Sequence, residues 1–560
     1  MISRSAIGQT AQRVVRRQCC AQPANRRGFA AATGSTSFSY ESADVNGIKV
    51  ASRDIAGHTT KLAVVAKAGT RYELLPGLTT GLEQFAFKNT QKRSALRLTR
   101  ESELLGGQLV AYHTREALVL EANFLRDDLP FFTELLSEVI SQTKFTPHEF
   151  LEEVNPAIHL KQKRAYANTA QIASDAAHGV AFHRGLGAPL YPTLHTPLAT
   201  YLNEESVSEF ASSAYTKQNI SVVANGANQA ELGKWVGEFF GDVSTKGSHE
   251  LPSKATKYYG GEERIAHSSA QNAFVIAFPG SSSFTAGSSY KPEIAVLAAL
   301  LGGKSTIKYS PGFSLLAKAA ASAPGANIST THAAYSDAGL LTINFSGPAL
   351  SVNSAATEAV KALKSIADGS INKEEFTKAI ALAKYRSLEE GQNIESGLVA
   401  TGSGLIQGGK PFQIDQVTKS IESVSQESLK TAAKALLEGK ASVAAVGDLR
   451  VLPFAEELGL RARRQNLNIT VKTPLSPHPT PPTIKMTFAW KQAGLSYNKY
   501  LAVAARVVRK SLKEEQRVAA ERRGLSELRS ARWENGKQGE VKNVADANKE
   551  AQVAAGNASS

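Results

Sequence analysis

The chain has 560 residues, of which 42% are hydrophobic and 20% are charged, and its formal net charge is +14. A chain of this length is too long for one hydrophobic core and predicts several domains. The positive charge lies at the two ends of the chain, because residues 38–457 alone carry a net charge of −3. Nucleic acid is therefore not an expected partner. No run of 18 or more apolar residues predicts a membrane span.

Residues 1–29 have the composition of a mitochondrial transit peptide, with a disordered basic arm as the alternative. The first 37 residues contain six Arg, and the first carboxylate of the chain is Glu41. The sequence at 27–29, Arg-Gly-Phe, is typical of sites after which matrix processing occurs. Cys19 and Cys20 both precede this point. The mature chain would then contain no thiol, which excludes disulfides, Cys-bound zinc and cysteine catalysis.

The main body contains an internal repeat of about 220 residues. Three pairs of segments match in the same order: 121–140 with 342–366, 146–164 with 371–390, and 219–228 with 440–449. A unit of this length is far too long for a solenoid repeat. The repeat predicts two homologous α/β (α+β) domains, each a mixed sheet with helices packed on one face.

We expect these domains at 38–242 and 263–457. The segment between them, 243–262, is rich in Ser, Lys, Gly and Pro and predicts a linker. Residues 458–485 contain five prolines and no acidic residue, which predicts a second, disordered linker. Residues 486–560 then form a C-terminal segment of different character, for which we expect a helix.

The segment 77–87, Gly-Leu-Thr-Thr-Gly-Leu-Glu-Gln-Phe-Ala-Phe, has the frame of a zinc-peptidase helix without its zinc ligands. In the inverted motif, His-x-x-Glu-His, two imidazoles one helical turn apart bind Zn²⁺ and the Glu acts as base. The same frame here contains Thr80, Glu83 and Gln84. Thr and Gln bind Zn²⁺ poorly, so we expect no metal and no catalytic residue. We expect Glu83 to bond to a neighbouring helix or strand.

Residues 38–457 resemble the pitrilysin-type metallopeptidase family. The matching stretches are 68–73 (Ala-Gly-Thr-Arg-Tyr-Glu), 77–79, 82–83, 85–90, 105–107 and 446–449. Within that family the chain is most similar to the core subunits 2 of mitochondrial cytochrome bc1 complexes, which are relatives of the mitochondrial processing peptidase. The resemblance implies a third zinc ligand, a Glu about 76 residues after the motif. Leu160 and Lys161 stand there instead.

This resemblance implies a non-catalytic scaffold subunit of the ubiquinol–cytochrome c reductase complex of the respiratory chain. Such a subunit lies peripherally on the matrix side of the mitochondrial inner membrane and contacts a homologous core subunit 1 and other subunits of complex III. It carries no haem, iron–sulfur cluster, quinone or other cofactor. The alternative is a zinc-dependent processing peptidase or its substrate-binding subunit. That alternative is weakened because segment 301–316 has fewer glycines than the substrate loop of that enzyme.

Residues 486–560 resemble the small ε subunit of mitochondrial ATP synthase. The matching residues are Trp490, Ala493 to Tyr497, Tyr500, Leu501, Arg509 and Ser511 to Lys513. An apolar stripe on a basic helix is formed by Tyr497, Leu501, Ala504, Val508 and Leu512, with Ser496 as the expected N-cap. In that family the peptide lies on the central stalk, so the resemblance implies contacts with the γ and δ subunits.

The first prediction concerns import. Because the acid-free segment ends at Arg-Gly-Phe, the mature protein should begin near Ala30 and contain no cysteine. N-terminal sequencing of the mitochondrial protein measures this. A mature chain that retains Cys19 and Cys20 would contradict the assignment.

The second prediction is that residues 1 to about 460 and 486–560 occur as separate proteins. Met486 is one of only two methionines and opens the ε-like segment. The scaffold would stand on one membrane complex, whereas the stalk peptide must turn with the rotor of another. A linker of about 25 residues spans at most about 80–90 Å and would be wound up by continuous rotation. Peptide mapping should find a small species beginning near Met486; an intact mature chain would exclude the separation.

Overall fold

The structure, a computed structural model, describes residues 39–461 except 253, 270, 286–288, 304–311 and 313. The predicted transit peptide, the C-terminal segment 486–560 and most of the predicted linker at 458–485 lie outside the described residues. The described residues all belong to one structural unit. None of the helices in this part of the chain has the length and apolar composition required to cross a bilayer.

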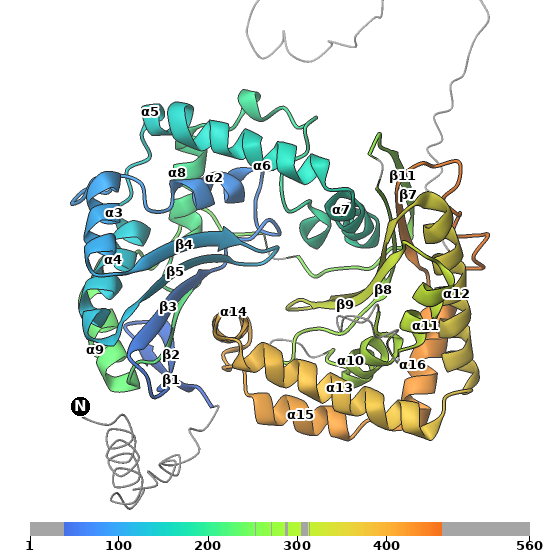
Figure 1. Ribbon diagram of the computed structural model, residues 1–560. Coiled ribbons are helices and arrows are strands. Elements are labelled where there is room, and N and C mark those ends of the chain that lie inside the picture. Colours follow the sequence, from blue (N-terminus) through green and yellow to red (C-terminus); the bar gives the residue numbers. More distant parts are fainter. Residues whose placement is uncertain are drawn as a thin grey trace, which may run out of the picture. The chain divides into compact units, whose positions relative to one another are not determined.

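A six-stranded mixed sheet forms the centre of the N-terminal half (Figure 1). Its strands are β1 (Glu41–Val45), β2 (Ile48–Arg53), β3 (Thr59–Ala66), β4 (Gln108–His113), β5 (Leu118–Leu125) and β6 (Ile220–Asn225). The order is β1-β2-β6-β3-β5-β4, and only β2 and β6 are parallel neighbours. The tight β1–β2 turn contains Asn46 and Gly47 with φ angles of 54° and 84°. Positive φ at both positions is typical of a type I′ hairpin.

The C-terminal half repeats this sheet without the first strand. Its strands are β7 (Gly261–Ala266), β8 (Asn272–Pro279), β9 (Asn327–Ala334), β10 (Gly339–Gly347) and β11 (Ser442–Gly447). The order β7-β11-β8-β10-β9, with β7 and β11 parallel, reproduces β2-β6-β3-β5-β4. The pairs β5/β10 and β6/β11 fall on the segments that repeat in the sequence. The prediction of two homologous mixed α/β sheets is therefore confirmed.

Helices follow the strands in a matching order in the two halves. The N-terminal half contains α2 (Leu78–Phe85), α3 (Ala95–Leu104), α4 (Leu129–Ser141), α5 (Pro147–Glu149), α6 (Asn155–Ala167), α7 (Thr169–Phe182), α8 (Glu204–Ala214) and α9 (Gln229–Phe239). The C-terminal half contains α10 (Pro292–Leu301), α11 (Leu315–Ser322), α12 (Ala349–Asp368), α13 (Lys373–Gln392), α14 (Ile394–Gly408), α15 (Ile414–Glu422) and α16 (Gln426–Glu438). Single turns are η1 (Arg126–Asp128), η2 (Phe150–Val154), η3 (Gly185–Gly187), η4 (Leu198–Thr200) and η5 (Phe240–Asp242).

Two boundaries differ from the sequence prediction. Strand β7 begins at Gly261, two residues inside the range predicted for the first linker. The predicted second linker begins too early, because Leu458 and Leu460 are buried in the core of the C-terminal half. The backbone N–H of Ala441, just before β11, also donates to the carbonyl of Arg461. The apolar contacts and this hydrogen bond together extend the C-terminal half to at least residue 461.

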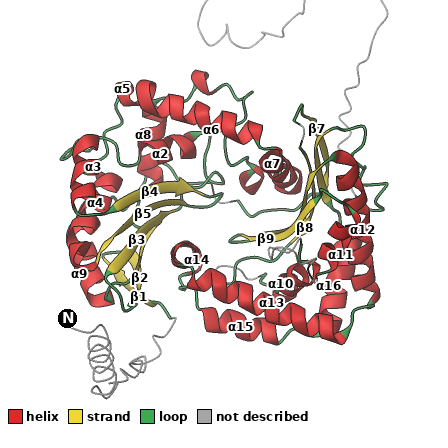
Figure 2. Cartoon of the chain, in the orientation of Figure 1, coloured by secondary structure: helices red, strands yellow, loops and turns green. Residues whose placement is uncertain are grey.

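Each half has its own main core on one face of its sheet. In the N-terminal half α4 and α9 pack on this face, and in the C-terminal half α12 does the same, with α16 packed on α12. Figure 2 shows these helices on the outer side of each sheet. This layer is the one that the sequence predicted.

The other face of each sheet is covered by a helix from the opposite half. Helix α7 of the N-terminal half packs on β8 and β11, and α14 of the C-terminal half packs on β3 and β6 (Figure 1). Small residues make these contacts: Ala173, Ala177 and Ala181 of α7 lie against Ala273, Ala277 and Ala444. Because both faces are covered, every residue of β6 and of β11 is buried. The predicted layout of helices on one face is therefore incomplete.

Hydrogen bonds fix the position of α14 on the first sheet. The hydroxyl of Ser221 donates to the carbonyl of Gly402 at 3.0 Å, and Lys49 Nζ donates to the carbonyl of Leu405 at 2.7 Å. A cation near the C-terminus of a helix is favourable because the helix dipole is negative there. Helix and sheet are very close at Gly402, where an added Cβ would lie 2.4 Å from Val65 Cγ2. This approach requires glycine.

The third prediction uses this contact. Gly402→Ala should lower the free energy of unfolding by about 1–3 kcal/mol, because the new methyl group overpacks against Val65. Gly179→Ala in α7 is the matched control, since its Cβ would meet only the carbonyl of Gly187 at 3.6 Å. That change should be neutral or stabilising by up to about 1 kcal/mol, because alanine favours the helix. Urea unfolding measures both variants, and equal stabilities would contradict the close packing of α14.

Candidate functional site

The degenerate motif lies on α2, whose start is determined by two residues before it. Gly77 has a φ angle of 98°, a conformation that favours glycine and turns the chain into the helix. The carboxylate of Glu73 accepts hydrogen bonds from the backbone N–H groups of Gly77 and Thr79, both at 3.2 Å. Burial raises the pKa of Glu73 to about 8, although these hydrogen bonds favour the charged form. These two hydrogen bonds from backbone N–H groups fix the first turn of α2 to Glu73.

The three motif residues share one face of α2, because they are three and four residues apart. Thr80 is 1% exposed and Glu83 is 7% exposed, whereas Gln84 is partly buried. Leu82 and Phe85 enter the core of the N-terminal half. The helix therefore holds the motif face rigidly, as a metal site would require, but with poor zinc ligands at 80 and 84.

Glu83 binds two side chains that come from different elements. Its Oε2 lies 2.6 Å from His113 Nδ1 on β4, and its Oε1 lies 2.5 Å from Lys161 Nζ on α6. The other ring nitrogen of His113, Nε2, lies 2.8 Å from the carbonyl oxygen of Leu190. Both nitrogens of this ring therefore face oxygen atoms of neighbouring elements. These are contacts to a neighbouring strand and helix, as the sequence predicted for Glu83.

The charge of Glu83 is balanced by these two partners. Burial alone would raise the pKa of Glu83, but the hydrogen bonds and positive charges of His113 and Lys161 lower it below its ordinary value of 4.5. Glu83 is therefore ionised at neutral pH. A general base needs a substrate or a water molecule to deprotonate, whereas this carboxylate is engaged at both oxygens.

Lys161 is a basic residue near the position at which the family resemblance implies the third zinc ligand. Its ammonium group contacts the motif helix directly. The resemblance implies a negative ligand near this position, where this chain has a positive group. The ammonium supplies part of the positive charge that a metal ion would have supplied beside Glu83. The side chain of Lys161 is 25% exposed.

No metal cluster is apparent elsewhere in the described part of the chain. Within residues 39–461 and outside their gaps, no group of three or more His, Cys, Asp and Glu side chains is arranged to hold a metal ion. Residues 304–311 of the predicted glycine-poor loop lie outside the described residues.

Sequence reasoning missed the partnership of Glu83 with His113 and did not assign a role to Lys161. His113 is 30 residues from Glu83, and no local pattern connects the two residues. The sequence did contain one indication of a role for Lys161, because this basic residue stands close to the position where a zinc ligand is expected. Only the packing of α6 against α2 brings its amino group to Glu83.

Three family models match the chain. Residues 49–194 match "Insulinase (Peptidase family M16)", and residues 201–382 match "Peptidase M16 inactive domain". Residues 488–536 match "Mitochondrial ATP synthase epsilon chain". The matches confirm both resemblances that the sequence analysis proposed.

Full-length relatives decide the family. A cytochrome b-c1 complex subunit 2 of Neurospora crassa is 59% identical over 82% of this chain and 100% of its own length. Relatives of the same name from Cryptococcus neoformans and Homo sapiens are 37% and 28% identical, over 72% and 74% of this chain and 90% of their own lengths.

The chain belongs to the cytochrome b-c1 complex subunit 2 family. It is a non-catalytic homologue of the M16 peptidases, as the sequence analysis predicted. The contact between Glu83 and Lys161 gives a physical reason why this chain is non-catalytic, because it engages the carboxylate that would act as base. The helix that would present zinc ligands instead presents a carboxylate that is bonded to His113 and paired with the ammonium of Lys161.

The fourth prediction tests this ion pair in the subunit 2 fold. Lys161→Met should destabilise the protein by about 1–3 kcal/mol at pH 7, because a buried carboxylate loses a charged hydrogen-bond donor. Lys163→Met on the same helix is the control, because Lys163 is exposed. Urea unfolding at several pH values measures the difference.

The pH dependence of this effect has a defined sign. The pKa of Glu83 is lowered in the folded state, so its contribution is present above the ordinary value of 4.5 and is lost as pH falls through the lower folded value. The difference between Lys161→Met and the parent should therefore shrink below about pH 4.5. A difference that is constant from pH 7 to pH 3 would contradict the ion-pair interpretation.

Proposed function

We propose that the chain is a non-catalytic core subunit of the mitochondrial ubiquinol–cytochrome c reductase complex, where it supports assembly and electron transport. The observation that carries this proposal is the 59% identity to a cytochrome b-c1 complex subunit 2 along the full length of that relative. Both carboxylate oxygens of Glu83 are hydrogen-bonded to His113 and Lys161, which agrees with a role that requires no peptide cleavage.

The location and partners follow from the same proposal. The transit-peptide composition of residues 1–29 supports import, and the Arg-Gly-Phe sequence supports processing in the matrix. We therefore place the protein on the matrix side of the inner membrane, against a homologous core subunit 1 and other subunits of complex III. Several large apolar side chains are available for such contacts, including Leu104 and Leu350, which are 85% and 76% exposed.

We propose a separate function for the ε-like segment, residues 486–560. The Neurospora crassa relative aligns over its whole length with 82% of this chain. The segment that matches the ATP synthase epsilon chain begins at residue 488, beyond the described fold. We propose that this segment serves a different assembly, where it would contact the γ and δ subunits.

Complementation tests the scaffold proposal. Residues 1–485 are expressed in a Neurospora crassa strain that lacks its own subunit 2, and respiratory complexes are separated on native gels. The expected result is recovery of an assembled complex III that contains the expressed chain and oxidises ubiquinol. Stable expression without entry into complex III would contradict the proposal.

The fifth prediction is that Glu83→Gln leaves ubiquinol oxidation per assembled complex unchanged. Gln keeps hydrogen-bonding atoms, so the local cost should be on the order of 1 kcal/mol, which can lower abundance but not turnover. Lys163→Met serves as the control for abundance. Presequence cleavage by the purified parent protein that disappears in Glu83→Gln would instead support the alternative, a zinc processing peptidase.

A further inference from the structure

Two hairpin turns from opposite halves meet at the junction of the sheets. The β4–β5 turn spans 114–117 and the β9–β10 turn spans 335–338, and each is closed by a backbone hydrogen bond between its first and fourth residues. The internal repeat relates these turns by an offset of 221 residues. It places Glu116 and Asp337 at the same position of the two turns. Two carboxylates therefore meet where the halves touch.

Arg71 lies between these carboxylates and binds both. Its Nη1 donates to Glu116 Oε1 at 2.7 Å and to Asp337 Oδ1 at 2.8 Å, and its Nη2 donates to Asp337 Oδ2 at 2.7 Å. The two bonds to Asp337 form the bidentate geometry in which arginine binds carboxylate most specifically. Arg71 belongs to the Ala-Gly-Thr-Arg-Tyr-Glu stretch at 68–73, which precedes the motif helix and contains none of its motif residues.

Further hydrogen bonds connect the same point to the inter-domain linker. Ser336 donates to Glu116 through its backbone N–H at 3.0 Å and through its hydroxyl at 2.6 Å. Thr256 donates to Asp337 through its backbone N–H at 2.8 Å and its hydroxyl at 3.0 Å. The side chains of Arg71 and Glu116 are only 7% and 10% exposed, so water screens this network little. Three separate segments are therefore joined by one guanidinium.

The repeat offers no second arginine of this kind. The registers of β3 with β5 and of β8 with β10 define an offset between β3 and β8 that, continued beyond the strand ends, brings Thr285 to the position of Arg71. The hydroxyl of Thr285 lies 3.2 Å from that of Ser283 and cannot bind two carboxylates as a guanidinium does. The charged part of the connection therefore depends on Arg71, while Ser336 joins the two turns directly through Glu116.

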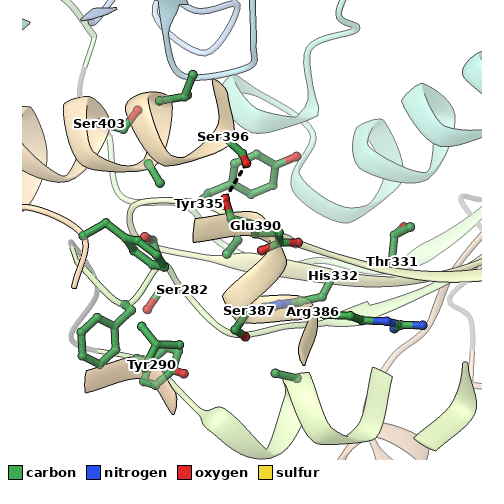
Figure 3. A pocket seen from close by; sticks show the side chains of 18 of the residues that line it. Ser282, Tyr290, Thr331, His332, Tyr335, Arg386, Ser387, Glu390, Ser396 and Ser403 are labelled. Atoms are coloured by element: carbon green, nitrogen blue, oxygen red, sulfur yellow. Dashed lines mark hydrogen bonds between the residues drawn. The ribbon is translucent and has the colours of Figure 1, made fainter. Parts of the chain in front are cut away.

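The packing contacts between the halves have a different character, although Ser221 and Lys49 also donate hydrogen bonds to α14. Helices α7 and α14 contact the opposite sheets largely through alanine, valine and leucine. Such packing is non-directional, whereas a bidentate ion pair specifies one relative position. The hairpin turns also border a cavity of about 910 Å³, whose wall includes Glu116, Tyr335 and Arg386. Figure 3 shows Tyr335 and Arg386 on elements that line this cavity.

We propose that Arg71 is a latch that locks the two halves in one closed arrangement and thereby keeps the cavity between the hairpin turns and α13 at a fixed size. Loss of the latch releases the hairpin turns and the linker together, while each sheet remains folded on its own core. The halves then remain joined by the packing of α7 and α14 and by the remaining hydrogen bonds, but in a less fixed relative position. This property goes beyond the scaffold function and does not depend on the complex in which the chain serves.

Amide hydrogen exchange of the full chain tests the latch. In Arg71→Met, amides at 254–258, in both hairpin turns and in α14 should exchange at least about tenfold faster, whereas amides in β3 and β8 should remain within about twofold of the parent. Asp337→Asn should give a smaller change in the same segments. Arg126→Met is the matched control, because Arg126 pairs with Asp54 at 2.8 Å inside the N-terminal half; it should leave all of these segments unchanged.

A double variant separates a latch from general destabilisation. If Arg71 and Asp337 act as one unit, Arg71→Met with Asp337→Asn should exchange no faster than Arg71→Met alone, because the interaction is already lost. Acceleration confined to residues 67–77, uniform acceleration in both sheets, or no acceleration would each overturn the proposal. Asp337→Asn decides alone if Arg71→Met does not fold, because Asp337 is 32% exposed at a turn and its replacement leaves the cores intact.

Discussion

The structure depends on an exchange of helices between its two halves. A sheet of apolar strands has two faces, and burying only one face would leave the alanine- and valine-rich side of β6 or β11 in water. Helices α7 and α14 solve this problem reciprocally, since each leaves its own half and covers the opposite sheet. Neither half can bury both faces of its sheet alone. The two domains therefore share one stability, and the junction between them is part of the core.

This constraint places the degenerate site and the inter-half contacts on a rigid frame. The edge strand β4 carries His113 toward Glu83 at one end of the motif helix, and the β4–β5 turn carries Glu116 toward Arg71. The same hairpin thus joins the motif helix to the junction of the halves. These charged groups fix the positions of elements relative to one another, which suits a scaffold.

The ion pair between Lys161 and Glu83 balances the negative charge of a buried carboxylate. A buried carboxylate is costly unless a positive group lies beside it. In a zinc peptidase the metal supplies that charge, whereas here Lys161 and His113 do so from the protein itself. The motif helix thus has a charge-balanced carboxylate at its buried face without a metal ion. The family thereby keeps the architecture of a peptidase in a protein without its chemistry.

The sequence by itself determined the duplication, the mixed sheets, the family and the absence of zinc ligands at Thr80 and Gln84, because each of these is recorded in local patterns or in residue identities. Only the tertiary structure decided which helix covers which sheet and which charges meet. Helices α7 and α14 look like ordinary helices of their own halves, and nothing in their periodicity names the opposite sheet as their partner. Likewise, Arg71 and Asp337 are 266 residues apart. Contacts between distant segments arise from the packing of whole elements, which no short stretch of sequence specifies.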